Sequence, residues 1–363
     1  MTSPGKVEIR EVPKPQPRPG QVLVRIEACG ICTSEQRIFN GAQHWERFPY
    51  VGGHEAVGVV EAIGPETATD VPVGSRVALF SATCGFCSHC RTGHTTKCLH
   101  RDAFWEYEGL WGTWGFADYR LVRPRGLQPI AKDVPLEQAA LAEPLSCAVH
   151  GVRRCHFELG DEVVVIGAGA MGLLNALVFK ARGAVVTVLD LVESRCQRAL
   201  DAGVARAFVP DVGTPSPNKR RDSAPAKRCR DFASRPDGEG TVERIQAFTG
   251  ECGPNVVVVA SSSPQAYELG RALLGPLGQL LAFAAVYPPT EAHIDWTQVH
   301  RSELRLFGAV SSDIEDIQIA GKLISSKLLD LPKAIETVVP FDRLAEAMAL
   351  AVRPDTYRVI LRM

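Results

Sequence analysis

The sequence predicts an α/β protein that is built around a doubly wound parallel sheet and carries a second domain of short strands. Between Asp161 and Asp190, a short apolar strand, a glycine-rich turn, an apolar helix and a second strand follow one another. Helices and buried strands then alternate as far as Gly308. From Gly58 to Phe80, by contrast, apolar residues alternate with Gly, Pro and Asp, which is typical of an irregular barrel. A chain of 363 residues is long enough for both domains.

The glycine-rich turn has the G-x-G-x-x-G spacing that binds a dinucleotide. It follows Val163–Ile166, a run that is β-branched and too short for a helix. The first glycine allows a tight turn, the second lets the backbone approach a pyrophosphate, and the third lets the helix pack against the strand. Free N–H groups at the start of the next helix, Leu173–Lys180, would bind the phosphates. The predicted cofactor-binding residues of this turn are Gly167, Gly169, Ala170, Met171 and Gly172.

An acidic residue ends the second strand of the motif. Asp190 follows Val185–Leu189 and lies 18 residues after Gly172, near the spacing of a carboxylate that binds the adenosine ribose. Such a carboxylate would repel a 2′-phosphate, so the sequence predicts NAD as the coenzyme. Arg195 is a candidate for stacking near the adenine, and its charge keeps NADP open as an alternative. Glycines alone would also fit an ordinary strand-to-helix turn, but strand, glycines, helix, strand and acid in register favour a dinucleotide site.

Composition excludes several classes of function. The net charge of −1 gives no general attraction to nucleic acid or to an anionic membrane. No window approaches eighteen consecutive apolar residues, so we expect no transmembrane span. The first twenty residues have no apolar segment of the signal-peptide kind, and we expect a cytoplasmic protein. Eleven cysteines in such a protein indicate metal binding rather than disulfides.

Four cysteines between residues 84 and 98 form the most specific motif of the chain. They are Cys84, Cys87, Cys90 and Cys98. Four thiolates can surround a tetrahedral zinc ion and leave no position for a substrate, which is what a structural site requires. A redox or disulfide cluster is the alternative. His89 and His94 lie among the cysteines, but four sulfurs already fill the shell, and we expect both histidines to be solvated.

Two shorter motifs precede this cluster, Gly-Ile-Cys at residues 30–32 and Gly-His-Glu at residues 53–55. With these motifs in this order, nearly the whole chain resembles a zinc-containing medium-chain dehydrogenase/reductase, the family of alcohol, sorbitol and threonine dehydrogenases. The resemblance implies a GroES-like β-barrel catalytic domain formed by residues 1–149 and 309–363. It implies that a Rossmann NAD-binding domain, residues 150–308, is inserted between them. The four cysteines match the structural-zinc lobe of the family.

The resemblance also implies a catalytic zinc ion. Cys32 and His54 fall on the first two ligand positions of the family, and the third position is Glu143, in Glu-Pro-Leu-Ser, as in sorbitol and threonine dehydrogenases. Glutamate there binds zinc directly or through water. Glu55 is a further carboxylate that such sites use, as an exchangeable fourth ligand. Two cysteines are alternatives: Cys29, which we expect in the core, and Cys147, one helical turn after Glu143.

Three residues near Cys32 have implied roles in proton transfer and orientation. An open zinc ion lowers the pKa of a substrate hydroxyl, and Ser34 stands at the family position through which the proton leaves. Glu35 is expected to orient His54 through the second ring nitrogen. Many relatives carry a histidine where this chain has Arg37, and a guanidinium cannot relay a proton as imidazole does. The relay beyond Ser34 therefore stays open.

Two stretches have two interpretations each. The aromatic residues between Phe104 and Tyr119 could line a substrate pocket or pack under the zinc lobe. Between these two stretches, Leu136–Val152 has helical periodicity, which predicts one helix, and this helix carries Glu143. Residues 210–240 are rich in Pro, Ser and charges and indicate an inserted surface loop, whose basic residues could contact an anion or be solvated.

The sequence thus predicts a zinc- and NAD-dependent oxidoreductase that moves a hydride from a secondary alcohol to NAD. The carboxylate among the zinc ligands favours a polyol, sugar, cyclitol or amino alcohol as the small-molecule substrate. A redox-neutral epimerase or lyase with tightly bound NAD is the nearest alternative, followed by a non-catalytic zinc-binding interaction protein. The family implies a homodimer or homotetramer, and the neutral charge argues against a nucleic-acid partner.

Overall fold

The computed structural model describes the 363-residue chain except residues 44–46, 103, 212–239, 287–288 and 293. The described chain forms two compact units. Unit 1 comprises Met1–Arg153, Gly169–Val178 and Val310–Met363, and unit 2 comprises Arg154–Ala168 and Phe179–Ala309. Most of the loop expected at 210–240 therefore lies outside the described residues.

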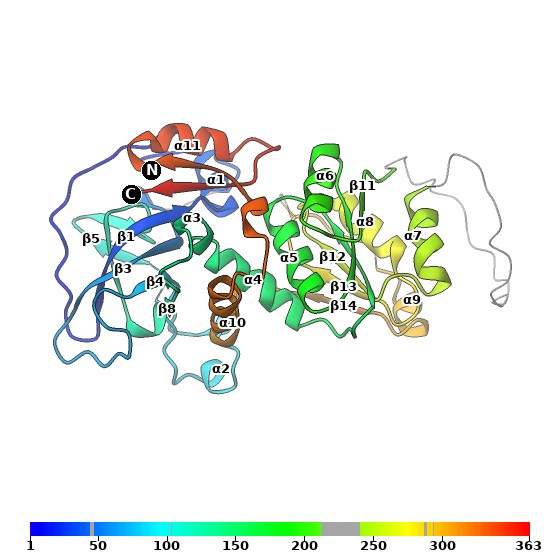
Figure 1. The fold of residues 1–363 in the computed structure, drawn as a ribbon, viewed down its shortest axis with the longest axis horizontal. Helices are drawn as coiled ribbons and strands as arrows, with labels where there is room; N and C mark the ends of the chain where they lie inside the picture. Colours follow the sequence, from blue (N-terminus) through cyan, green and yellow to red (C-terminus); the bar gives the residue numbers. More distant parts are fainter. Residues whose placement is uncertain (44–46, 103, 212–239, 287–288, 293) are drawn as a thin grey trace. The chain divides into compact units, whose positions relative to one another are not determined.

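The large sheet of unit 1 has the strand order β15-β16-β1-β3-β4-β8, and β7 also pairs with β1. Strand β1 is the centre of this sheet because it pairs antiparallel with three others, and most of its residues are buried (Figure 1). Only β15 and β16 pair in parallel within the described sheet. The strands are β1 (Val22–Gly30), β3 (Glu55–Ile63), β4 (Arg76–Leu79), β7 (Tyr119–Val122), β8 (Leu127–Pro129), β15 (Ile335–Pro340) and β16 (Arg358–Arg362).

A smaller sheet in unit 1 holds the loop that carries His54. Its order is β2-β6-β5, where β2 spans Tyr50–Val51, β5 spans Trp105–Tyr107 and β6 spans Leu110–Gly112. Strand β2 pairs in parallel with β6 and ends three residues before His54. The register of this small sheet therefore fixes where the histidine loop begins.

Two helices of unit 1 carry candidate metal ligands: α2 carries Cys90, and α4 carries Glu143. The stretch expected as one helix from 136 to 152 forms two, α3 and α4, with a break at Ala140–Leu141. Helix α5 starts at Ala170, three residues before the predicted start. Its residues up to Val178 belong to unit 1, and its last residues, from Phe179, belong to unit 2. The helices are α1 (Thr33–Phe39), α2 (Ser88–Arg91), η1 (Thr95–Lys97), η2 (Pro124–Gly126), α3 (Leu136–Ala139), α4 (Ala142–Arg153), α5 (Ala170–Ala181), α10 (Ile314–Ser325), η4 (Leu331–Ala334), η5 (Phe341–Arg343) and α11 (Leu344–Ala351).

The core of unit 1 is apolar and lies between the large sheet and α11. Val24 and Ile26 of β1 pack there with Leu361 of β16 and with Met348 of α11. Cys29 belongs to the same cluster and is fully buried, which confirms the expectation that it packs in the core.

Unit 2 contains a parallel sheet of the doubly wound kind, with the order β11-β10-β9-β12-β13-β14 among the described strands. This order reverses direction beside β9, where a Rossmann fold binds its ligand at the carboxyl ends of the strands. The strands are β9 (Glu162–Ile166), β10 (Val185–Leu189), β11 (Arg206–Phe208), β12 (Val256–Val259), β13 (Gln279–Ala282) and β14 (Arg305–Gly308). The helices are α6 (Glu193–Asp201), α7 (Thr241–Thr249), η3 (Gly250–Cys252), α8 (Pro264–Leu273) and α9 (Trp296–Arg301).

The central strands of unit 2 are buried as the sequence predicts. Val163, Val164 and Val165 of β9 are fully buried, as are all four valines of β12. In the part of the chain that the structure describes, no helix is long and apolar enough to cross a membrane.

Candidate functional site

Three potential metal ligands lie together in unit 1. Cys32 precedes α1, His54 follows β2, and Glu55 begins β3. One ligand atom from each lies within 4.8 Å of the other two. A thiolate, an imidazole and a carboxylate are the ligand types that zinc prefers. The predicted pair Cys32 and His54 is therefore brought together, and Glu55 is the carboxylate nearest to it.

The chain holds His54 in a tight turn. Gly53 has φ +88°, and a Cβ there would lie 2.6 Å from the ring of Phe116 and 2.7 Å from its backbone nitrogen. Only glycine fits that position. The Nδ1 atom of His54 lies 2.8 Å from Oε1 of Glu35, and the N–H of Gly53 donates to the same oxygen at 3.1 Å. The turn and Glu35 together fix the direction of the imidazole ring.

The groups around His54 shift its pKa. Burial alone would lower the pKa of His54, but Glu35 and Cys32 outweigh burial and raise it well above its usual range. Burial would raise the pKa of Glu35, and the contact with His54 and the N–H of Gly53 lower it below the usual value. Glu35 is 1% exposed and the His54 side chain is 27% exposed, so water reaches this pair only from the histidine side. The site is a strongly coupled group of a thiol, an imidazole and carboxyl groups.

Glu55 is a buried acid with unused acceptor capacity. Its side chain is almost fully buried, and neither carboxylate oxygen accepts a hydrogen bond from any residue that the structure describes. Burial raises the pKa of Glu55 to about 7, although Arg358 and His54 lower it. Buried acceptors of this kind normally have partners. A cation held by Cys32, His54 and Glu55 would supply one, so these residues fit a zinc ion.

Arg358 is a buried residue that sequence reasoning missed. Its Nε lies 3.1 Å from Oε2 of Glu55, its Nη1 donates to the carbonyl of Ile31 at 3.1 Å, and its Nη2 lies 3.3 Å from Sδ of Met171. The ion pair with Glu55 lacks the geometry of a hydrogen bond. The sequence carried a signal, because Arg358 interrupts the otherwise apolar stretch Tyr357–Leu361. A buried arginine in a strand requires a buried acid nearby.

Glu143 lies near this group but is not part of it. It stands in the first turn of α4 and contributes to raising the pKa of Glu55. Its carboxylate does not belong to the set of ligand atoms within 4.8 Å. The thiol of Cys147 lies 3.6 Å from Oε1 of Glu143, and burial raises the pKa of Cys147 well above its usual value. A protonated thiol that donates to Glu143 is a poor metal ligand.

Ser34 contacts a carboxylate. Its hydroxyl lies 3.3 Å from Oε2 of Glu35, in the first turn of α1. Glu35 thus contacts Ser34 through one carboxylate oxygen and His54 through the other. The three residues form a continuous hydrogen-bonded row.

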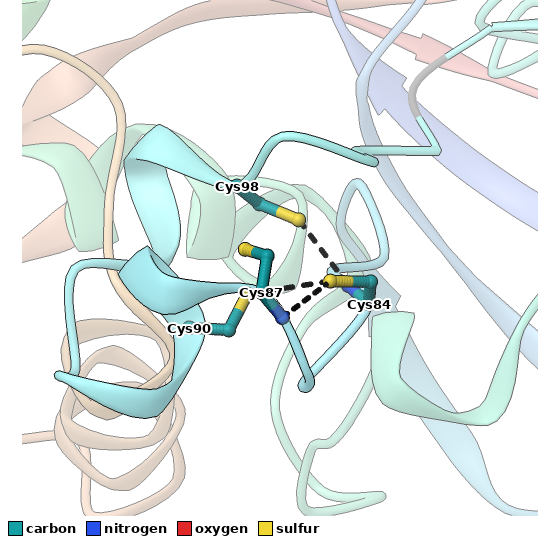
Figure 2. A group of neighbouring side chains, drawn as sticks. All are labelled: Cys84, Cys87, Cys90 and Cys98. Atoms are coloured by element: carbon teal, nitrogen blue, oxygen red, sulfur yellow. Dashed lines mark hydrogen bonds between the residues drawn. The ribbon is translucent and has the colours of Figure 1, made fainter.

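The four cysteines of the lobe form a second metal-binding group. Figure 2 shows Cys84, Cys87, Cys90 and Cys98 gathered in one place. One sulfur from each lies within 4.8 Å of the others. The N–H of Cys84 donates to Sγ of Cys98 at 3.3 Å, and the N–H of Cys87 donates to Sγ of Cys84 at 3.4 Å. Backbone donors of this kind stabilise thiolates, and four thiolates at this spacing fit a closed zinc site.

The lobe favours the thiolate form at Cys87 and the thiol form at Cys90. Backbone N–H groups of Leu99 and Cys90 lower the pKa of Cys87 to about 6. Burial raises the pKa of Cys90 to about 12, and side-chain contacts with Cys98, Cys87 and Cys84 add to the rise. Neither His89 nor His94 is among the grouped ligand atoms, and His94 is exposed.

A third group, His150, Asp313 and Asp316, is held by hydrogen bonds. Oδ2 of Asp316 lies 2.7 Å from Nδ1 of His150 and accepts from the N–H of Asp313 at 2.9 Å. Oδ1 of Asp316 accepts from Arg153. Burial would raise the pKa of Asp316, and the bonds from His150 and Arg153 outweigh burial and lower it. These donors, one of them a guanidinium, satisfy the carboxylate without a metal ion.

The glycine-rich turn of unit 2 has the geometry that the spacing predicts. Gly167 has φ +100°, and a Cβ there would lie 3.2 Å from the backbone of Ala260. The N–H of Ala168 donates to Oδ2 of Asp190 at 2.7 Å, and the N–H of Val192 donates to Oδ1 at 2.9 Å. Nη1 of Arg195 lies 3.6 Å from Oδ2 of Asp190. Asp190 is thus fixed at the end of β10, and Arg195 lies beside it.

The remaining glycines of the motif lie at the start of α5. The N–H of Leu173 donates to the carbonyl of Gly169 at 2.9 Å, which begins the helix at Ala170 and Met171. Gly172 is buried, as close packing between helix and strand requires.

The aromatic stretch divides between core and surface. Trp114 and Phe116 are buried, and Nε1 of Trp114 donates to the carbonyl of Trp105. Trp111 stacks on Phe104, with ring centroids 4.6 Å apart, and Phe104 is 41% exposed. Core packing therefore accounts for Trp114 and Phe116, and the pocket interpretation stays open for the other pair.

Comparison with known families gives two matches in chain order. Residues 18–132 match the family described as alcohol dehydrogenase GroES-like domain. Residues 170–326 match the family described as zinc-binding dehydrogenase.

Individual relatives cover almost the whole chain. A 2-dehydro-3-deoxy-L-galactonate 5-dehydrogenase from Pseudoalteromonas atlantica is 30% identical over 92% of this chain and 88% of its own. A sorbitol dehydrogenase from Halalkalibacterium halodurans is 27% identical over 89% and 86%. The solved structure of galactitol-1-phosphate dehydrogenase from Escherichia coli shares the fold, with a TM-score of 0.80, 23% identity, and coverage of 100% of this chain and 98% of the other.

Proposed function

The chain belongs to the zinc-binding dehydrogenase family and is a zinc-dependent alcohol oxidoreductase, and from that premise we propose that it oxidises polyols or related secondary alcohols with NAD. The single observation that supports the site assignment most is the convergence of Cys32, His54 and a buried carboxylate within 4.8 Å. We also propose that residues 1–149 and 309–363 form the GroES-like catalytic domain and 150–308 the inserted Rossmann domain.

The proposed catalytic ligands are Cys32, His54 and Glu143, with Glu55 as the exchangeable carboxylate. A zinc ion bound there supplies a Lewis acid that lowers the pKa of a substrate hydroxyl. The position of Glu55 beside Cys32 and His54 supports its part in the exchange, and Arg358 offers it an alternative partner. Glu143, in the first turn of α4, would complete the set. Cys84, Cys87, Cys90 and Cys98 hold the structural zinc.

The residues around His54 handle the proton and the orientation. Glu35 holds the imidazole through Nδ1, which directs Nε2 to the ligand position. Ser34 would accept the proton of the substrate hydroxyl and at the same time donate its own hydroxyl proton to Oε2 of Glu35, 3.3 Å away. Glu35 would then be the next group of the relay in this chain, which has Arg37 where many relatives carry a histidine.

Coenzyme preference rests on Asp190. Its oxygens accept one backbone N–H each, and each keeps a lone pair for a ribose hydroxyl. A 2′-phosphate would meet this negative charge, which favours NAD. The ion pair with Arg195 reduces the repulsion, so NADP is the second coenzyme to test. The proposed phosphate cradle is Gly167, Gly169, Ala170, Met171 and Gly172.

The substrate class is proposed from the relatives. The relatives named above act on a sugar acid, a sugar alcohol and a sugar-alcohol phosphate by their names. A carboxylate among the ligands also distinguishes this site from one with two cysteines and a histidine. Both points favour polyhydroxylated secondary alcohols. By family resemblance, we further propose that the chain forms a homodimer or homotetramer.

The test is NADH formation by the zinc-loaded protein over a panel of sugar alcohols, free sugars, sugar acids, cyclitols, amino alcohols and simple alcohols. We expect a rate with one polyol class and its loss by a factor of about 10³ or more in His54→Ala, because that change removes a ligand. His94→Ala, an exposed histidine of the lobe, is the matched control and keeps the rate. Silence across the panel by a protein that holds zinc and NAD would instead favour the redox-neutral alternative.

A further inference from the structure

The N-terminal end of α10 touches both the cysteine lobe and the helix that carries Glu143. On one side, Oδ1 of Asp313 accepts from the hydroxyl of Thr95 at 3.1 Å and from the N–H of Thr96 at 2.7 Å. The N–H of Ile314 donates to the same Thr95 hydroxyl at 3.0 Å. Thr95 is buried and lies three residues before Cys98. The lobe is therefore tied to the start of α10 by three hydrogen bonds.

On the other side, α10 contacts α4 at two levels. The Ser312 hydroxyl lies 2.8 Å from the hydroxyl of Ser146, which donates to the carbonyl of Glu143 at 2.7 Å. The Ser146 hydroxyl is the donor in both contacts, so its one proton is shared between the Glu143 carbonyl and the Ser312 hydroxyl. One helical turn further along α4, His150 meets Asp316. Ser146 and Ser312 are 0% and 4% exposed, so water does not compete for these bonds.

The backbone before α10 is also held in an unusual conformation. Ser311 has φ +59°, which is uncommon for a residue other than glycine. Its hydroxyl accepts from Nη2 of Arg101 at 2.9 Å, and Arg101 follows the lobe directly. Such a conformation persists only where the surroundings fix it. The segment Ser311–Asp316 is therefore anchored from both sides.

We propose that this segment couples the cysteine lobe to the catalytic metal site and that Ser312 is a positioning residue that acts through Glu143. Ser312 and Ser146 fix the carbonyl of Glu143 and with it the first turn of α4. The lobe, through Thr95, fixes the place of Ser312. The inference rests on the proposed role of Glu143 as a zinc ligand, and it gives the four-cysteine zinc a part in setting the affinity of the other site.

The experiment measures how tightly each of the two zinc ions is held, by titrating the zinc-loaded full chain with a chelator. The variants are Ser312→Ala, Glu143→Gln and the double variant. Ser326→Ala is the matched control, because it removes an exposed hydroxyl at the far end of the same helix. Cobalt in the catalytic site adds a spectroscopic signature, since its absorption reports the ligand geometry. Neither readout needs a substrate.

We expect Ser312→Ala to weaken the catalytic-site metal about tenfold, within the range for residues that orient ligands. In Ser312→Ala the affinity of the four-cysteine site for zinc stays unchanged. In the Ser326→Ala control both sites keep their affinities. In the double variant the loss equals that of Glu143→Gln alone, because Ser312 acts through Glu143. Thr95→Val removes the contact to α10 from the lobe side, and we expect it to weaken the catalytic-site metal selectively in the same way. It is the second variant if Ser312→Ala folds poorly.

Four results would overturn the coupling, and only the last of them is also a failure of the proposed function. If Glu143→Gln weakens the metal and Ser312→Ala does not, the ligand set stands and the coupling is wrong. If the losses in the double variant add, Ser312 does not act through Glu143. If Ser312→Ala loosens both zinc ions equally, its role is general stability. If Glu143→Gln leaves the affinity unchanged, the ligand assignment itself is wrong, and the coupling falls with it.

Discussion

At the scale of single residues, we propose that Asp190 binds the adenosine ribose of the coenzyme. Its carboxylate is 9% exposed and is aimed by two backbone N–H groups. We expect Asp190→Ser to weaken NADH binding about tenfold or more, because bonds to a charged group are worth roughly 1.5–3 kcal/mol. NADPH binding should weaken less or improve. Coenzyme fluorescence titration measures both constants.

Asp201→Ser is the control for that change, because Asp201 is an exposed carboxylate of α6 that bonds only to Gln197 among the described residues. It should leave both coenzyme constants within about twofold. Unchanged NADH affinity in Asp190→Ser would contradict the ribose assignment.

Asp316 gives a prediction for acid stability. Its pKa is lowered in the folded chain, so its contribution is present above the unfolded pKa of about 3.9 and is lost as pH falls below it. Asp316→Asn should lower the free energy of unfolding at neutral pH by roughly 1–3 kcal/mol. The difference from the parent should shrink as the pH falls towards and below about 4. Urea unfolding across that pH range measures it.

Glu315→Gln is the matched comparison, because Glu315 contacts the same Arg153 from a side chain that is 67% exposed. Exposed pairs contribute little, and we expect a change within about 0.5 kcal/mol. An equal loss in both variants would show that burial of Asp316 is not the source of its effect.

At the scale of elements, we expect the cysteine lobe to depend on a bound metal ion for its structure. The segment from Cys84 to Cys98 has only two short helices, α2 and η1, and its four sulfurs are its shared centre. Cys87→Ser should reduce bound zinc from about two ions per chain to one, because a structural site needs all four ligands. Metal analysis of the purified protein measures this. Cys252→Ser, at an exposed cysteine, should keep both ions. Two ions in Cys87→Ser would argue against a four-thiolate site.

Elements governed by local pattern could be predicted from the sequence. The strand at Val185–Leu189 has the predicted bounds, and the Rossmann order confirms the predicted α/β class. The helix predicted over 136–152 breaks at Ala140–Leu141, although both residues are apolar and buried. The glycine at 167 was predictable because its left-handed φ excludes other residues.

Contacts between distant segments could not be predicted in this way. Periodicity says that Arg358 lies on a strand, but only the pairing of β16 with β1 brings it to Glu55. The same holds for Asp316 and His150, which lie 166 residues apart in the chain. The motifs drew attention to Glu143, and the structure places Glu55 closer to Cys32 and His54. Motif spacing identifies candidate ligands, while their distances depend on tertiary packing.

At the scale of the whole molecule, the family predicted from the motifs is confirmed by both family matches and by a relative with 30% identity over 92% of the chain. The two groups that could hold zinc and the dinucleotide motif fit an alcohol oxidoreductase, in which a hydride passes between a carbinol carbon and a nicotinamide ring. The redox-neutral alternative keeps its coenzyme bound and returns the hydride to the same substrate.

The most direct test runs the reaction in reverse with NADH that carries deuterium at the transferred position. The zinc-loaded chain is incubated with a panel of ketoses and keto acids, and mass spectrometry of the alcohol products locates the label. The account predicts one deuterium on the new carbinol carbon with the parent protein and none with His54→Ala. Product alcohol without label, or label formed equally well by His54→Ala, would contradict it.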